Sequence, residues 1–299
     1  MCGIVGLFLK DAKLEPRLGE LTTTMLSTMC ERGPDSAGFA VYGAPAKGKA
    51  KITLQSPNPD VHFAGLTAAI SKAIGADVSL DRKSTHAVMS VPGDKLRAAR
   101  DALRTGHPDL RVMSSGESIE IFKEVGYPTQ VATQFELAKM QGSHAIGHTR
   151  MATESAVTTM GAHPFSTGPD QCLVHNGSLS NHNAVRRTLM REGLTFETDN
   201  DSEVAAGYLT WRMREGLSLG DALQASLADL DGFYTFVVGT ESGFGVLRDP
   251  IACKPAVMAE TERWVAFGSE YRALVDLPGI GGAKVWEPEP AKVYFWERH

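Results

Sequence analysis

Residues 2–9 read CGIVGLFL, a run that is apolar apart from two glycines. The run is too short and too broken by glycine for a helix, so it predicts a buried strand. Its first residue, Cys2, directly follows Met1 and precedes a glycine that permits close approach of other backbone. Cys2 is therefore either the first residue of a core strand or a thiol placed at a chain end for chemistry.

The composition is that of an ordinary globular protein. The chain has 299 residues, of which 42% are hydrophobic and 22% charged, with a formal net charge of −5. This mild acidity argues against nucleic acid or an anionic membrane as the main partner. No apolar stretch reaches the roughly 18 residues that span a bilayer. The first apolar run also has no basic lead of the kind that secretory signals carry. We expect a cytoplasmic protein.

The cysteines do not form a recognisable metal motif. No pair among Cys2, Cys30, Cys172 and Cys253 has the spacing of zinc or iron–sulfur ligands. We therefore expect reduced thiols, and no metal or cofactor in this chain. Cys30, Cys172 and Cys253 have apolar or small neighbours, which predicts that they pack in the interior.

The hydrophobic pattern of the sequence changes along the chain. Apolar residues at helical spacing predict a helix over 17–30, and short strands dominate from residue 143 onward. Helices are expected at about 180–193 and 201–216. Many short strands with a few helices favour stacked sheets flanked by helices.

Residues 44–142 differ from the rest, because strand and helix patterns alternate there. We expect a small α/β insertion with a core of its own. A helix over 60–76 with Asp60 as N-cap and a hairpin formed by 110–116 and 118–126 are predicted within it. The insertion contains no catalytic constellation, which favours a packing or interaction role.

Cys2 could combine two chemical functions. Removal of Met1 is plausible because the next side chain is small, and it would leave a free α-amino group on Cys2. Such an amine has a pKa of about 7.7–8.0, close to the value at which a general base works best. One residue would then supply both nucleophile and base.

A thiolate that attacks a carbonyl needs donors for the oxyanion. In the segment VHNGSL, Asn176 offers its side-chain amide and Gly177 its backbone N–H. The same Asn-Gly pair is also common in tight turns, so a purely structural interpretation stays open.

Arg150 and Asp201 could hold the two ends of an amino acid. Arg150 ends an apolar strand, where its guanidinium could grip a carboxylate in bidentate fashion or simply extend to the surface. Asp201 or Asp199 could serve as a plain N-cap of the following helix. Together, Arg150 and Asp201 would bind an α-carboxylate and an α-ammonium, with the substrate's side chain directed at Cys2.

The order of these segments resembles that of the class II glutamine amidotransferases. Cys2–Ile4 is followed by RGPDSAG (32–38), GHTRMAT (147–153), HNG (175–177), DSE (201–203), RDP (248–250) and FGSE (267–270). The resemblance covers 2–43 and about 143–298. It implies an α+β fold, the four-layer αββα sandwich of two antiparallel sheets found in N-terminal-nucleophile (Ntn) hydrolases. A glutaminase domain would then span 2–298, interrupted by the 44–142 insertion.

The resemblance also implies roles for individual residues. Cys2 matches the nucleophile that hydrolyses L-glutamine through a γ-glutamyl thioester and releases ammonia. The other matches are Asn176 and Gly177 in the oxyanion hole, Arg150 at the glutamine carboxylate, Asp201 at its ammonium, Thr153 beside the carboxylate and His163 near the pocket. Two positions depart from the family pattern. Met151 stands where an aromatic residue is common, and Glu154 stands where sugar-aminating members carry histidine.

The acceptor of the ammonia is expected on another polypeptide. The sequence contains neither an SGGxDS loop for adenylation nor a phosphate-binding glycine-rich motif. Its layout resembles glutamate-synthase-related amidotransferase subunits, with the N-methylglutamate synthase small subunit as the closest type. FMN and iron–sulfur clusters would then belong to partner subunits. Two alternatives remain: an N-terminal-cysteine amidase for another amide, and a non-catalytic assembly subunit.

Overall fold

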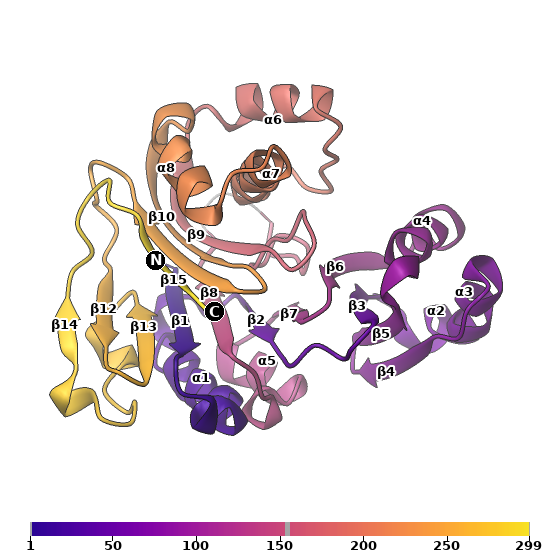
Figure 1. Ribbon diagram of the computed structural model, residues 1–299, viewed down its shortest axis with the longest axis horizontal. Coiled ribbons are helices and arrows are strands. Elements are labelled where there is room, and N and C mark those ends of the chain that lie inside the picture. Colours follow the sequence, from indigo (N-terminus) through magenta and orange to yellow (C-terminus); the bar gives the residue numbers. More distant parts are fainter. Residues whose placement is uncertain (1, 153–155, 299) are drawn as a thin grey trace.

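Two antiparallel sheets stacked face to face form the centre of the protein in a computed structural model, which describes residues 2–152 and 156–298 (Figure 1). The first sheet has seven strands in the order β14 (Lys284–Trp286), β12 (Val257–Glu260), β13 (Trp264–Gly268), β1 (Gly3–Leu9), β8 (His144–Arg150), β2 (Ser36–Tyr42) and β7 (Ile119–Val125). The second has four strands in the order β15 (Tyr294–Glu297), β11 (Gly243–Arg248), β10 (Gly232–Gly239) and β9 (Cys172–Leu179).

Helices cover the outer face of each sheet. The seven-stranded sheet carries α1 (Leu18–Ser27) and α5 (Pro128–Gln134), and the four-stranded sheet carries α6 (His182–Arg191), α7 (Asp201–Arg214) and α8 (Leu219–Asp229). The predicted four-layer αββα architecture is confirmed. Short 3₁₀ helices are η1 (Ala12–Arg17), η2 (Cys30–Arg32), η3 (Gly93–Lys95), η4 (Leu137–Lys139), η5 (Tyr271–Ala273) and η6 (Ile280–Gly282).

Helix α8 was not predicted, although the sequence contains its signal. The Ser218 side chain caps it by accepting the backbone N–H of Asp221 at 3.1 Å, which is the usual N-cap arrangement. Its apolar residues then recur at helical spacing and pack against the four-stranded sheet.

Strand β1 explains why the opening run is apolar at nearly every position. Alternate side chains of a strand point to opposite faces, and both faces of β1 are buried. Val5, Leu7 and Leu9 pack in the cluster beneath α1, whereas Ile4 and Phe8 pack between the two sheets.

The insertion forms its own four-stranded sheet in the order β4 (Ser79–Lys83), β5 (His86–Pro92), β3 (Lys49–Gln55) and β6 (Arg111–Gly116). One face packs on α3 (Leu66–Ile74) and α4 (Leu96–Gly106), with the short α2 (Pro59–His62) preceding them. The predicted single helix over 60–76 is wrong, because Gly65 adopts a left-handed conformation between α2 and α3.

The insertion that folds separately from the main body is shorter than the predicted 44–142. The expected hairpin between 110–116 and 118–126 does not form, because β6 pairs with β3 whereas β7 pairs with β2 of the main sheet. Ile119 and Ile121 of β7 pack between the two sheets, whereas Phe122 packs in the cluster beneath α1. The chain therefore returns to the main body directly after Gly116.

The insertion is firmly attached to the main body. His86 of β5 lies with its ring centroid 4.7 Å from that of Phe135 and 5.8 Å from that of Phe122. Lys51 of β3 forms a 2.7 Å salt bridge with Glu120 of β7. Burial of His86 lowers its pKa to about 3, so it packs as a neutral ring.

The three remaining cysteines divide into two groups. Cys30 and Cys172 are buried as predicted, but Cys253 is exposed. The prediction for Cys253 is wrong because it lies in the loop after β11, beyond the buried Asp249 that closes the turn. Among the helices that the structure describes, none combines the length and the apolar character needed to cross a membrane.

The two sheets approach closely at Gly6, which generates a test of the fold. A Cβ at Gly6 would lie 2.7 Å from the Phe244 ring. We expect Gly6→Ala to lower the free energy of unfolding by about 1–3 kcal/mol through overpacking, measured by chemical denaturation. Phe244→Leu should offset part of this loss in the double variant. At Gly106 a Cβ meets open space, so equal losses in Gly6→Ala and Gly106→Ala would contradict the packing.

Candidate active site

Two side chains fix the backbone that follows Cys2. The Gly3 amide donates to Thr149 Oγ1 at 3.2 Å, and the Ile4 amide donates to Ser269 Oγ at 2.9 Å. Cys2 itself is partly exposed just before β1. Cys2, which directly precedes β1, is thus held at a defined position on the edge of the sandwich.

The carbonyl oxygen of Cys2 accepts two further hydrogen bonds. Arg32 Nε donates at 3.0 Å and Asn176 Nδ2 at 3.2 Å. Arg32 is in turn held by a 2.5 Å salt bridge to Glu270. Three of the quoted segments, around residues 32, 176 and 270, therefore meet at Cys2. Arg32 and Glu270, which lie in the quoted segments RGPDSAG and FGSE, anchor this chain end.

The orientation of the Asn176 amide follows from its contact with His148. Asn176 Oδ1 lies 3.1 Å from His148 Nε2. An amide oxygen can only accept, so His148 must carry its proton on Nε2. Asn176 therefore directs its NH₂ group, a donor, toward Cys2. Its acceptor there is the backbone carbonyl oxygen of Cys2, and the same NH₂ group also donates to the Ser269 hydroxyl at 3.4 Å.

The next residue in β9 has to be glycine. Gly177 has a φ of +144°, and a Cβ at this position would lie 2.0 Å from the carbonyl oxygen of Phe233. The Asn-Gly pair is thus part of a strand rather than a hairpin turn. The sequence identified the pair but left its structural setting open.

Arg150 occupies the last position of β8 and is only 7% exposed. Its Nη1 atom donates to the Ala156 carbonyl at 3.3 Å. The turn around Asp35 holds this strand end, because the Asp35 amide donates to the Arg150 carbonyl at 3.1 Å and its carboxylate accepts from the Ala152 amide at 2.8 Å. The Arg150 guanidinium is therefore buried and does not extend to the surface.

The loop after Arg150 is described only in part. Met151 is 38% exposed. Thr153 and Glu154 lie outside the described residues, as does Met1, so the interpretations attached to these positions stay predictions.

Asp201 is the first residue of α7 but not its N-cap. The cap is Asn200, whose side chain accepts from the Ser202 amide at 2.8 Å. Asp201 instead uses Oδ2 to accept from the Leu179 amide at 2.9 Å, which ties α7 to the strand that carries Asn176. The N-cap interpretation of Asp201 and Asp199 is therefore wrong.

A chain of buried polar groups connects Asp201 with Asn176. Ser202 Oγ lies 2.8 Å from His163 Nε2 and 2.9 Å from His175 Nδ1. The His163 ring stacks on His148 with their centroids 4.1 Å apart. His148 then contacts Asn176, so His163 links the helix with Asp201 to the strand with Asn176.

These histidines are neutral at physiological pH. Burial lowers the pKa of His148 to about 3 and that of His163 well below its usual value, and the charges of neighbouring groups act in the same direction on His163. Burial also lowers the pKa of His175, although the Asp201 carboxylate opposes this shift. Three uncharged rings leave the negative charge of Asp201 uncompensated by an adjacent imidazolium.

Three members of this network were not singled out from the sequence. His148, His175 and Ser202 each lie within one of the quoted segments, GHTRMAT, HNG and DSE. A histidine on an apolar strand is usually a packing residue, and only the three-dimensional contact with Asn176 reveals its role in orienting an amide.

Comparisons with known proteins show the family to which the chain belongs. A glutamine amidotransferase domain model matches residues 148–276. The chain is 64% identical to the glutamine amidotransferase-like protein GlxB of Rhizobium meliloti (strain 1021), over 99% of this chain and 98% of that protein. It is 33% identical to a putative glutamine amidotransferase of Methanothermobacter thermautotrophicus, over 98% of this chain and 99% of that protein.

Solved structures share the fold. The glutamine phosphoribosylpyrophosphate amidotransferase of B. subtilis superimposes with a TM-score of 0.62 at 21% identity. The match covers 99% of this chain but 47% of that one, so the chain corresponds to about half of the larger protein.

The lowered histidine pKa values can be tested by NMR. We expect the ring signals of His148 and His163 to stay those of neutral imidazole down to about pH 5, where a free histidine with a pKa of about 6.5 is mostly charged. In the unfolded chain these rings take up protons below about pH 6.5, so the free energy of unfolding should fall as the pH falls from there. Titration of either ring near pH 6.5 in the folded protein would contradict the described burial.

Proposed function

Since the chain belongs to the class II glutamine amidotransferases, we propose that Cys2 hydrolyses L-glutamine after Met1 has been removed. The observation that supports this best is the Asn176 amide, which donates to the backbone carbonyl oxygen of Cys2 and is oriented by His148. A donor fixed next to the residue that carries the thiol suits acyl transfer, in which negative charge develops on a carbonyl oxygen.

The reaction proceeds through a covalent intermediate. The α-amine of Cys2 takes the thiol proton, directly or through a water, and the thiolate attacks the side-chain amide carbon of glutamine. Asn176 Nδ2 and the Gly177 N–H stabilise the tetrahedral oxyanion. The C–N bond then breaks, the amine returns the proton to the departing nitrogen, and ammonia leaves. Water hydrolyses the γ-glutamyl thioester and releases glutamate.

Binding of glutamine needs one positive and one negative group. Arg150, almost fully buried, suits the α-carboxylate because a guanidinium can form two parallel hydrogen bonds with it. The Asp201 carboxylate suits the α-ammonium, and the neutral His163 and His175 nearby add no competing positive charge. Thr153 is proposed to add a hydrogen bond beside the carboxylate, and His163 to border the pocket.

Ammonia transfer is the second half of the proposal. The acceptor site would lie on a separate synthase subunit of the glutamate-synthase type, with FMN and iron–sulfur clusters in the partner subunits. The N-methylglutamate synthase small subunit is the proposed subtype. The lack of adenylation and phosphate-binding motifs in this sequence supports an acceptor on another chain.

Replacement of the nucleophile tests the chemistry. We expect Cys2→Ala to abolish glutamate release from L-glutamine, since it removes the thiol proposed as the nucleophile. Cys253→Ala removes an exposed thiol and should leave the rate unchanged. Undiminished glutamate release by the Cys2→Ala variant would refute the proposed function, and equal hydrolysis of simple amides by the native protein would favour the general amidase instead.

Replacement of the oxyanion donor tests the geometry. Asn176→Ala should lower kcat by about 10²–10³, the usual loss for one such donor, with a smaller change in KM. Asn183, exposed on α6, offers the matched control Asn183→Ala, which should keep the native kcat. If Asn176→Ala raises KM alone, the side chain binds ground-state substrate rather than the developing oxyanion.

A further inference from the structure

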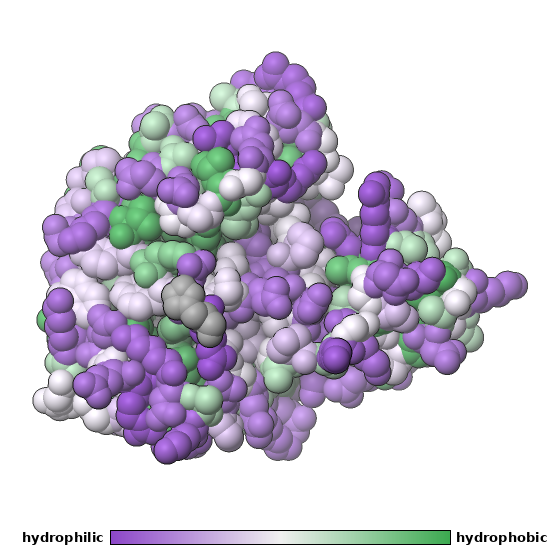
Figure 2. All heavy atoms as spheres, viewed as in Figure 1, coloured by the Kyte–Doolittle hydropathy of each residue, from purple (hydrophilic) through white to green (hydrophobic). Residues whose placement is uncertain are grey.

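Two connected hollows lie between the insertion and the main body, where Figure 2 shows a notch between the two parts. The outer cleft has a volume of about 920 Å³ and is lined by α4 and the start of β6 on one side. The loops 167–169 and 193–197 form the other side. A narrower chamber of about 100 Å³ continues inward along β6. Cys2 lines neither hollow, so they are separate from the proposed catalytic centre.

Five arginines line the outer cleft: Arg97, Arg100 and Arg104 on α4, Arg111 on β6, and Arg214 at the end of α7. They outnumber the lining carboxylates, which are Asp94, Asp101 and Glu197. The chain as a whole has a net charge of −5, so the local excess of positive charge in the cleft is opposite in sign to the net charge of the chain.

Only one of the five arginines forms a salt bridge within the described residues. Arg104 lies 3.4 Å from Asp101, both of them exposed, and such pairs contribute little. The other four form no salt bridge with any residue in 2–152 or 156–298. Arg97, Arg100 and Arg104 share one face of α4, where like charges repel. An anionic ligand would relieve this repulsion.

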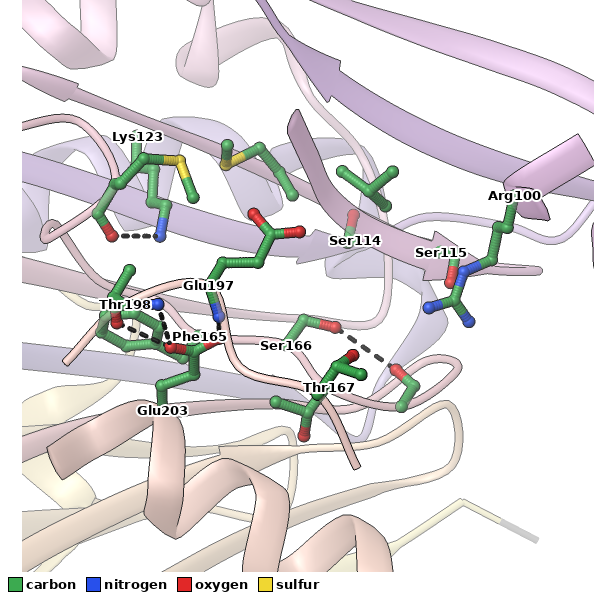
Figure 3. A pocket seen from close by; sticks show the side chains of 15 residues that line it. Arg100, Ser114, Ser115, Lys123, Phe165, Ser166, Thr167, Glu197, Thr198 and Glu203 are labelled. Atoms are coloured by element: carbon green, nitrogen blue, oxygen red, sulfur yellow. Dashed lines mark hydrogen bonds between the residues drawn. The ribbon is translucent and has the colours of Figure 1, made fainter. Parts of the chain in front are cut away.

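The inner chamber contains an unsatisfied polar group. Ser114 on β6 is 2% exposed, and its hydroxyl has no hydrogen-bond partner within the described parts of the chain. A buried hydroxyl without a partner is costly. Figure 3 shows Arg100 extending from α4 beside Ser115, and the Glu197 side chain directed into the same space.

We propose that this cleft binds a small polyanion, a compound with two or more carboxylate or phosphate groups. The arginines hold its charged groups through bidentate hydrogen bonds, and Ser114 meets a polar end of the ligand in the chamber. The volume of the cleft is within the range of small-molecule sites, which are common at the boundary between two domains.

The walls of this site continue into the proposed glutamine site. The Glu203 carboxylate accepts from the amides of Glu197 and Thr198 at 2.8 Å each, and Glu203 lies two residues after Asp201 in α7. On the other side, Phe165 of the chamber lies two residues after His163. The cleft is therefore connected to Asp201 through α7, and to His163 through the short segment that ends at Phe165.

The proposal can be tested by calorimetric titration of the full-length native protein at constant ionic strength. One arm of the experiment uses citrate and the other uses pyrophosphate. We expect saturable binding of one anion per chain in at least one arm, and the arm that binds identifies the carboxylate or phosphate class. Arg100→Gln combined with Arg111→Gln should weaken that binding at least tenfold, because charge-assisted hydrogen bonds are lost. Ser114→Ala should weaken it by a smaller factor.

Arg187→Gln is the matched control, because Arg187 is exposed on α6 and does not line the cleft. It should bind like the native protein. The double variant should fold normally, verified by circular dichroism, since both of its arginines are exposed. Absence of saturable binding in both arms, or equal loss in Arg187→Gln, would overturn the proposal. The readout is binding, so it remains informative if glutamine hydrolysis is not observed.

Discussion

The position of Cys2 depends on the burial of β1 between two layers. Side chains on both faces of this strand are removed from water, so the strand cannot slide by one residue without moving each of them to the opposite face. The hydrogen bonds from Gly3 and Ile4 to Thr149 and Ser269 then extend this fixed register to the chain end. The sandwich thus holds the thiol's backbone in place, and the surrounding polar groups are built around it.

A buried polar network is the second consequence of this arrangement. His148, His163, Ser202 and Asn176 are enclosed, and burial keeps the two histidines neutral. Neutral rings have fixed donor and acceptor atoms, which is what allows His148 to determine the direction of the Asn176 amide. The same enclosure carries a cost, since one ring nitrogen of each histidine lacks a partner among the described residues.

The sequence predicted the sandwich and the segments that meet at Cys2, because both depend on local patterns: apolar strands and short polar motifs in a fixed order. It did not predict that β7 rejoins the main sheet, since its apolar pattern fits either sheet. It assigned no role to Arg32, because the contact of Arg32 with the Cys2 carbonyl links residues 30 positions apart. The arginines of the cleft are likewise dispersed along the chain, so their proximity becomes visible only when α4, β6 and α7 are assembled.

We propose that Cys2, freed of Met1, is a nucleophile specific for glutamine. Peptide mass spectrometry after exposure to an electrophilic glutamine analogue tests it most directly, because exposed Cys253 provides a competing thiol in the same chain. We expect a single adduct, on a peptide that begins at Cys2, and protection from it by excess L-glutamine. Modification of Cys253 instead of Cys2, or an adduct that L-glutamine does not suppress, would contradict it.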